Sequence, residues 1–101
     1  MGSKNLNELR VIINSQAERK GWCREKWYLM ARAASELGEF IDAKQRGDEK
    51  RASLEVIDVL YFLLQLIPND IDLVMAFLEK YNSNEVNRKK TISEDDGFVM
   101  K

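Results

Sequence analysis

The sequence predicts an all-α protein with four helices and a short fifth, forming one subunit of an oligomeric helical bundle. Only one of its 101 residues is proline and five are glycine, and long stretches contain neither, which favours helices. Apolar residues also recur three and four positions apart, which is the period of one helix face. The length suits a single domain over residues 1–101. Within it, residues 1–4 resemble a cloning remnant and residues 91–101 form a tail.

The first helix is expected over residues 5–20, where apolar side chains follow helical spacing. Asn5 and Glu8 have the spacing of a capping box, with Asn in place of the usual Ser or Thr. Gly21 follows the last periodic residue and can end the helix in a left-handed conformation.

The second and third helices are expected to form an antiparallel hairpin. The second covers residues 24–46 and ends at Gly47, and the third covers residues 49–67 and ends before Pro68. Asp48 is placed to cap the third helix. The connection is short, so the two helices should be neighbours.

A fourth helix is expected over residues 71–81, with Asp70 as its cap. The polar cluster of residues 82–84 predicts a break, and residues 86–90 predict a short basic fifth helix.

The third helix is apolar around most of its circumference, and Tyr61 and Phe62 are counted among its apolar residues. Its polar side chains Arg51, Glu55, Asp58 and Gln65 share one narrow stripe. A chain of this length cannot cover such a helix on its own. We therefore expect a homodimer or homotetramer with this helix near its centre.

Four carboxylates are predicted to meet between the second and third helices. Glu36 and Glu39 are three residues apart, as are Glu55 and Asp58, so each pair projects from one helix face. The two pairs lie at similar heights above the predicted turn. Gly38 costs about 0.5–1 kcal/mol inside a helix, which predicts a close backbone approach there. The alternative is two solvated acidic faces without a shared site.

The residue types limit the chemistry of this site. The chain has no histidine, which excludes Ser-His and Cys-His nucleophiles, Glu-x-x-His di-iron sites and most catalytic zinc sites. Oxygen ligands alone suit Mg²⁺, Mn²⁺ or Ca²⁺. The net charge of −1 favours neither nucleic acid nor an anionic membrane as a partner. The single cysteine fits a cytoplasmic location.

Two motifs resemble the MazG-like family of all-α nucleoside triphosphate pyrophosphatases. They are Glu36-Leu-Gly-Glu39 and Glu55-Val-Ile-Asp58, which match the family's E-x-x-E and E-x-x-D signature. The resemblance implies Mg²⁺-dependent hydrolysis of nucleoside triphosphates, with Mn²⁺ as a substitute, to a monophosphate and pyrophosphate. It implies the four acids as metal ligands, with Glu39 and Glu55 as the catalytic candidates. Ser35 stands where the family often has a further Glu, which leaves the number of metals open.

The resemblance also implies substrate contacts outside the acidic motif. Trp22 matches an aromatic residue that stacks on the base, although packing in the core or at an interface explains it equally well. Trp27 and Tyr28 are expected to be core or dimer contacts. The predicted phosphate-binding residues follow the fourth helix: Lys80, Asn84, Asn87 and Arg88.

Two further interpretations stay open. A phosphoribosyl-ATP pyrophosphohydrolase would share the fold and the metal site. A non-catalytic helical oligomer, acting as a binding or regulatory module, would keep the acidic pocket without turnover.

Overall fold

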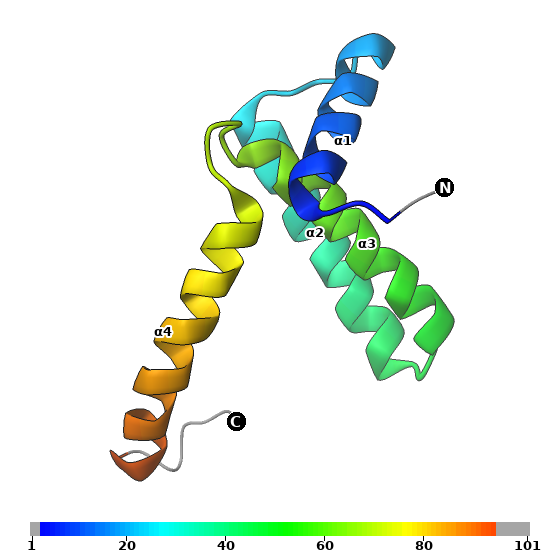
Figure 1. The fold of residues 1–101 in the computed structure, drawn as a ribbon. Helices are drawn as coiled ribbons and strands as arrows, with labels where there is room; N and C mark the ends of the chain where they lie inside the picture. Colours follow the sequence, from blue (N-terminus) through cyan, green and yellow to red (C-terminus); the bar gives the residue numbers. More distant parts are fainter. Residues whose placement is uncertain (1–2, 95–101) are drawn as a thin grey trace. The chain divides into compact units, whose positions relative to one another are not determined.

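The computed structural model describes residues 3–94, with side chains up to residue 86, and its regular elements are four helices (Figure 1). They are α1 (Leu6–Lys20), α2 (Lys26–Gln45), α3 (Glu49–Leu66) and α4 (Leu73–Glu94). No strand occurs in this range, which confirms the all-α prediction. The chain forms two compact units that divide between Asp70 and Ile71.

The start and end of α1 match the predicted signals. The Asn5 side chain accepts a hydrogen bond from the backbone N–H of Glu8, and the Glu8 carboxylate accepts one from the backbone N–H of Asn5. At the other end, Gly21 adopts φ 71°. The N–H of Trp22 then donates to the carbonyl of Ala17, which satisfies an orphan carbonyl of the last turn.

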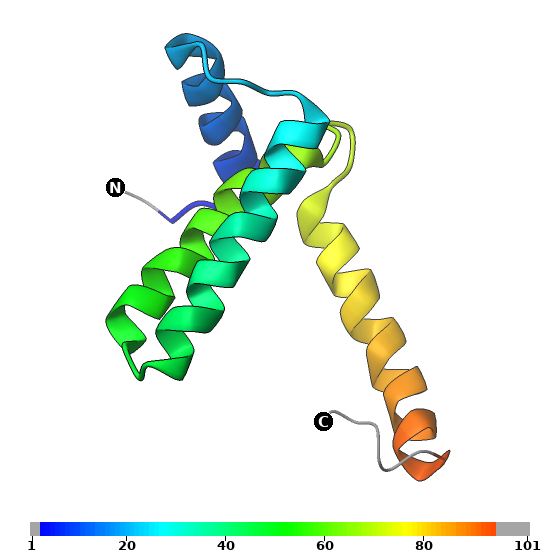
Figure 2. The ribbon, with the colours of Figure 1, turned by 180° about the vertical axis from the view of Figure 1, so that it is seen from behind.

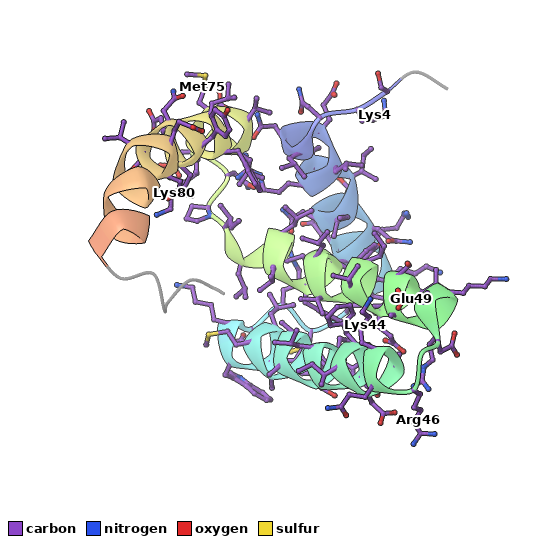
Figure 3. The ribbon with its side chains drawn as sticks, turned by 90° about the horizontal axis from the view of Figure 1, so that it is seen from below. Lys4, Lys44, Arg46, Glu49, Met75 and Lys80 are labelled. Atoms are coloured by element: carbon purple, nitrogen blue, oxygen red, sulfur yellow. The ribbon has the colours of Figure 1, made fainter. Side chains whose placement is uncertain are left out.

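The α2–α3 turn is built by a glycine and an aspartate. Gly47 has φ 78°, and the Asp48 N–H donates to the Ala43 carbonyl at 2.9 Å, which closes α2 in a Schellman motif. The Asp48 side chain then accepts from the Arg51 N–H and caps α3. Lys44 and Glu49 form an ion pair of 2.8 Å beside this turn (Figure 3). The predicted hairpin is therefore confirmed.

The first unit is centred on the α2–α3 hairpin. The two helices run antiparallel along their whole length, and α1 packs against α3 (Figures 1 and 2). Many of the buried residues in the hairpin are alanines, which allow the backbones to approach closely. The buried apolar side chains of this unit are Ile13, Ala17, Leu29, Ala33, Ala43, Ala52, Val59 and Leu64.

Arg10 connects α1 by hydrogen bonds to the segment that follows α3. This role was not predicted from the sequence. Its side chain is buried and donates to the carbonyls of Pro68, at 2.7 Å, and Asn69, at 3.3 Å. It also donates to the Asn7 side chain. These bonds satisfy carbonyls just beyond the end of α3, where no helical partner is available.

The second unit corrects three predictions. Its helix α4 begins at Leu73, and Asp72 instead of Asp70 accepts a hydrogen bond from the backbone N–H of Met75. The helix then continues through residues 82–84 to Glu94, so the predicted break and the separate fifth helix were wrong. Asn and Ser cost only a few tenths of a kcal/mol each in a helix, and these exposed residues need no turn. Residues 95–101 of the predicted tail lie outside the described range.

Gly38 also departs from its prediction. A Cβ atom added to Gly38 would meet nothing within 4 Å. The close backbone approach predicted there is therefore absent from the described chain, because the glycine lies on an exposed part of α2.

Among the described residues, no helix combines the length and the apolar character needed to cross a lipid bilayer.

Candidate metal and nucleotide site

Three of the four predicted carboxylates meet between α2 and α3. Glu36, Glu39 and Glu55 each offer one oxygen, and these oxygens lie within 4.8 Å of one another. Glu36 is buried, the side chain of Glu55 is 13% exposed, and that of Glu39 is 49% exposed. The group therefore has a buried side and an open side, as a site that admits a ligand requires.

The negative charges at this place raise the pKa of Glu36. A hydrogen bond shared with Glu55 contributes most, followed by burial and by the charges of Glu55, Asp58 and Glu39. Arg32 forms an ion pair with Glu36, since its Nη2 lies 3.0 Å from Glu36 Oε2. The Arg32 side chain is 43% exposed, so water screens its charge. The pKa of Glu36 is raised despite this ion pair. The site thus favours the binding of positive charge.

A guanidinium occupies the open side of this acidic group. Arg51 Nη2 lies 3.3 Å from Glu39 Oε1, and Arg51 Nε lies 3.3 Å from Glu55 Oε2. The hydrogen bond to Glu55 is the main cause that raises the pKa of Arg51. Arg51 therefore joins the acids of α2 and α3 as their counter-ion.

Asp58, the fourth predicted ligand, is not part of the group of three. It lies close enough to raise the pKa of Glu36, but it is exposed and lines the neighbouring pocket. Asp58 therefore stands between the acidic group and that pocket.

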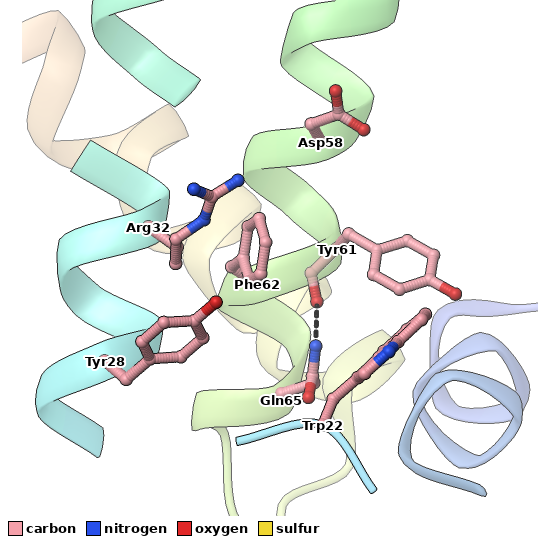
Figure 4. A pocket seen from close by; sticks show the side chains of 7 residues that line it. All are labelled: Trp22, Tyr28, Arg32, Asp58, Tyr61, Phe62 and Gln65. Atoms are coloured by element: carbon pink, nitrogen blue, oxygen red, sulfur yellow. Dashed lines mark hydrogen bonds between the residues drawn. The ribbon is translucent and has the colours of Figure 1, made fainter. Parts of the chain in front are cut away.

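An aromatic pocket, drawn in Figure 4, adjoins the acidic group, because Arg32 lines the pocket and donates a hydrogen bond to Glu36. Its volume is about 310 Å³. Most of its wall is formed by the rings of Trp22, Tyr28, Tyr61 and Phe62, and its polar groups come from Arg32, Asp58 and Gln65. Flat apolar walls with a few polar groups are typical of small-molecule sites.

Arg32 connects the pocket with the acidic group. Its guanidinium donates to Glu36 and lies 5.3 Å from the centre of the Phe62 ring, within cation–π range. Its buried Nε–H has no acceptor among the described residues. The Arg32 guanidinium thus places a positive charge between the acidic group and the pocket.

Trp22, a substrate candidate in the first unit, lies in the aromatic pocket that Asp58 also lines. It follows Gly21 in the segment between α1 and α2 and lines the aromatic pocket. Lys80 and Asn84 line a groove on α4, together with Phe77 and Tyr81, in the second unit. Asn87 and Arg88 belong to α4, but their side chains lie outside the described residues. The phosphate-binding roles of these four residues stay predictions.

Several pocket residues were missed from the sequence. Tyr28 was interpreted as a core or dimer contact, yet it is half-buried in the pocket wall. Tyr61 and Phe62 were counted only among the apolar residues of α3. The available signal was their position, because Asp58, Tyr61 or Phe62, and Gln65 are three or four residues apart.

In comparisons with known proteins, no protein-family model matches this chain, and no curated protein or solved structure matches it. The resemblance to the MazG-like enzymes therefore stays a prediction.

Proposed function

We propose that the protein is a Mg²⁺-dependent hydrolase that cleaves ribo- or deoxyribonucleoside triphosphates between the α- and β-phosphates. The products are a nucleoside monophosphate and pyrophosphate, and the role is removal of surplus or non-canonical nucleotides. One observation carries the proposal. The carboxylates of Glu36, Glu39 and Glu55 lie next to an aromatic pocket on the same hairpin, which suits the anionic and the flat halves of a nucleotide.

The acidic group fits Mg²⁺ by its chemistry. All its donors are carboxylate oxygens, which are the ligands Mg²⁺ prefers. The pKa of Glu36 is already raised by a hydrogen bond with Glu55, by burial and by the charges of the neighbouring carboxylates. Glu36, Glu39 and Glu55 would hold the ion, with Asp58 as the fourth candidate and Mn²⁺ as a substitute. When bound, Mg²⁺ supplies charge that neutralises the triphosphate and acidifies water.

The chain's own residues then have separate roles. Glu39 is the most exposed of the three acids, so it can take the proton from a water that attacks the α-phosphorus, with Glu55 as the second candidate. The bond from the α-phosphorus to the bridging oxygen breaks, and pyrophosphate leaves with that oxygen. Arg32 stabilises negative charge on the phosphates, as would Lys80, Asn84, Asn87 and Arg88. Trp22 stacks on the base.

A homo-oligomer belongs to this proposal. Large apolar side chains on α3 remain open to solvent in the single chain: Leu54 is 61%, Ile57 54% and Leu60 44% exposed. Exposed apolar surface of this kind marks a protein interface. We expect a dimer or tetramer by size-exclusion chromatography with light scattering. A mass near 11.8 kDa would contradict this part.

The decisive experiment identifies the products. Each ribo- and deoxyribonucleoside triphosphate, and phosphoribosyl-ATP, is incubated with the protein and MgCl₂, and the products are identified by ³¹P NMR. A monophosphate and pyrophosphate are expected from a nucleoside triphosphate, with no turnover in excess EDTA. Orthophosphate and a diphosphate would refute the reaction. Exclusive cleavage of phosphoribosyl-ATP would indicate that narrower activity, and Mg²⁺ binding without any turnover would favour a non-catalytic module.

A further inference from the structure

Gln65 contributes a fixed hydrogen-bond acceptor to the aromatic pocket. Its Nε2 lies 3.1 Å from the backbone carbonyl oxygen of Tyr61 and donates a hydrogen bond to it. A carbonyl oxygen can only accept, so the NH₂ end of the amide must face it. The Oε1 end therefore faces the other way, as Figure 4 shows.

The free oxygen of Gln65 is the side of the amide that a ligand can use. Among the described residues, Oε1 accepts no recorded hydrogen bond, and Gln65 lines the pocket together with Trp22 and Tyr61. The hydroxyls of the pocket tyrosines can rotate to donate or accept. The Gln65 amide cannot turn without setting its oxygen against the Tyr61 carbonyl. Gln65 therefore presents a fixed hydrogen-bond acceptor at its place in the pocket.

The spacing along α3 suits an extended nucleotide. Gln65 lies seven residues beyond Asp58, which is about 10 Å along a helix. Figure 4 shows Asp58 and Gln65 at opposite ends of the group of residues that line the pocket. If the edge of the base lies at Gln65, the phosphates of the same nucleotide reach the carboxylates near Asp58.

We propose that Gln65 makes the site select bases that carry an amino group at position 4 of a pyrimidine or position 6 of a purine. Cytosine and adenine present a donor there, whereas uracil, thymine, hypoxanthine and guanine present a carbonyl oxygen. The amino group of the base donates a hydrogen bond to Oε1. A carbonyl oxygen at the same position cannot donate, and its partial negative charge would repel that of Oε1. This inference rests on the proposed hydrolysis of nucleoside triphosphates and names its substrate class.

The test compares two substrate pairs that differ at this one group, dCTP with dUTP and dATP with dITP. We expect kcat/KM to favour the amino member of each pair by about tenfold, as one hydrogen bond can supply. Gln65→Met removes the acceptor and should bring both ratios close to one. Gln65→Lys replaces it with a donor and should favour dUTP and dITP. Gln45→Met, at the end of α2 and outside the pocket, is the matched control and should leave the ratios unchanged.

The outcomes separate this inference from the function on which it rests. Pyrophosphate release with equal kcat/KM within both wild-type pairs would overturn the role of Gln65 and leave the hydrolase intact. The same conclusion follows if Gln65→Met, with unchanged helical circular dichroism, keeps the wild-type ratios. Absence of turnover with every nucleotide would overturn the hydrolase and the selectivity together.

Discussion

Arg51 Nε lies 3.3 Å from Glu55 Oε2, so the acidic group contains its own counter-ion. The same guanidinium reaches Glu39 on the facing helix. A divalent cation that binds these carboxylates must compete with Arg51 or displace it. The ion pair thus links the metal affinity of the site to one exposed side chain.

Arg51→Met should therefore tighten Mg²⁺ binding by about three- to fivefold, since exposed ion pairs of this kind are weak. Isothermal titration calorimetry of the metal-free protein measures the change. Arg46→Met is the control, because Arg46 pairs with Asp42 away from the three acids. Weaker Mg²⁺ binding by Arg51→Met would mean that Arg51 positions the carboxylates instead of competing for them.

The raised pKa of Glu36 predicts how stability depends on pH. Between its ordinary value of 4.5 and the raised value, the folded protein holds a proton that the unfolded chain has released. A rise in pH through this window therefore lowers the free energy of unfolding. In EDTA, wild type should lose stability relative to Glu36→Gln as pH rises above 4.5, as followed by urea denaturation. Saturating Mg²⁺ should offset the loss, and a relative gain by wild type in EDTA would contradict the prediction.

The position of Asp58 predicts a graded effect among the acids. Glu55→Gln removes one of the three clustered carboxylates and should lower kcat/KM by roughly 100-fold or more. Asp58→Asn should weaken Mg²⁺ binding less than Glu55→Gln, because Asp58 lies outside the group of three. Glu49→Gln is the matched control on the same helix, since Glu49 pairs with Lys44 at the turn. Equal losses of Mg²⁺ affinity in the two site variants would make Asp58 a full fourth ligand.

Gly38→Ala should stabilise the isolated chain. The new methyl group would meet nothing within 4 Å, and alanine is favoured over glycine inside a helix by about 0.5–1 kcal/mol. Urea denaturation followed by circular dichroism measures the gain. A loss of stability, or a smaller assembly in light scattering, would show that Gly38 faces another molecule.

The local features of the fold were predictable from short stretches of sequence. The capping box of Asn5 and Glu8, the left-handed Gly21 and the Asp48 cap each depend on neighbouring residues, and the structure contains all three. The hairpin followed from the same signals. The continuation of α4 could not be read in this way, because its polar residues at 82–84 are compatible with both a turn and an exposed helix.

Only the part of the candidate site that follows from helical spacing was predicted from the sequence. The spacing of Glu36 and Glu39, together with the predicted hairpin, accounts for their meeting with Glu55. The pocket requires the side chains of α2, α3 and the α1–α2 segment to meet, and their packing is not encoded in any one stretch. Arg10 illustrates the same limit, since its partners Pro68 and Asn69 are far away in the sequence.

The three carboxylates of the acidic group come from residues that are close together in the sequence, because α2 and α3 form a hairpin. The three carboxylates come from two helices joined by the tight turn at Gly47 and Asp48, so little loop-closure entropy opposes their meeting. Contacts between residues close in sequence also form early in folding. The three carboxylates can therefore come together before α1 docks through Arg10, so the geometry of the acidic group does not depend on the first helix.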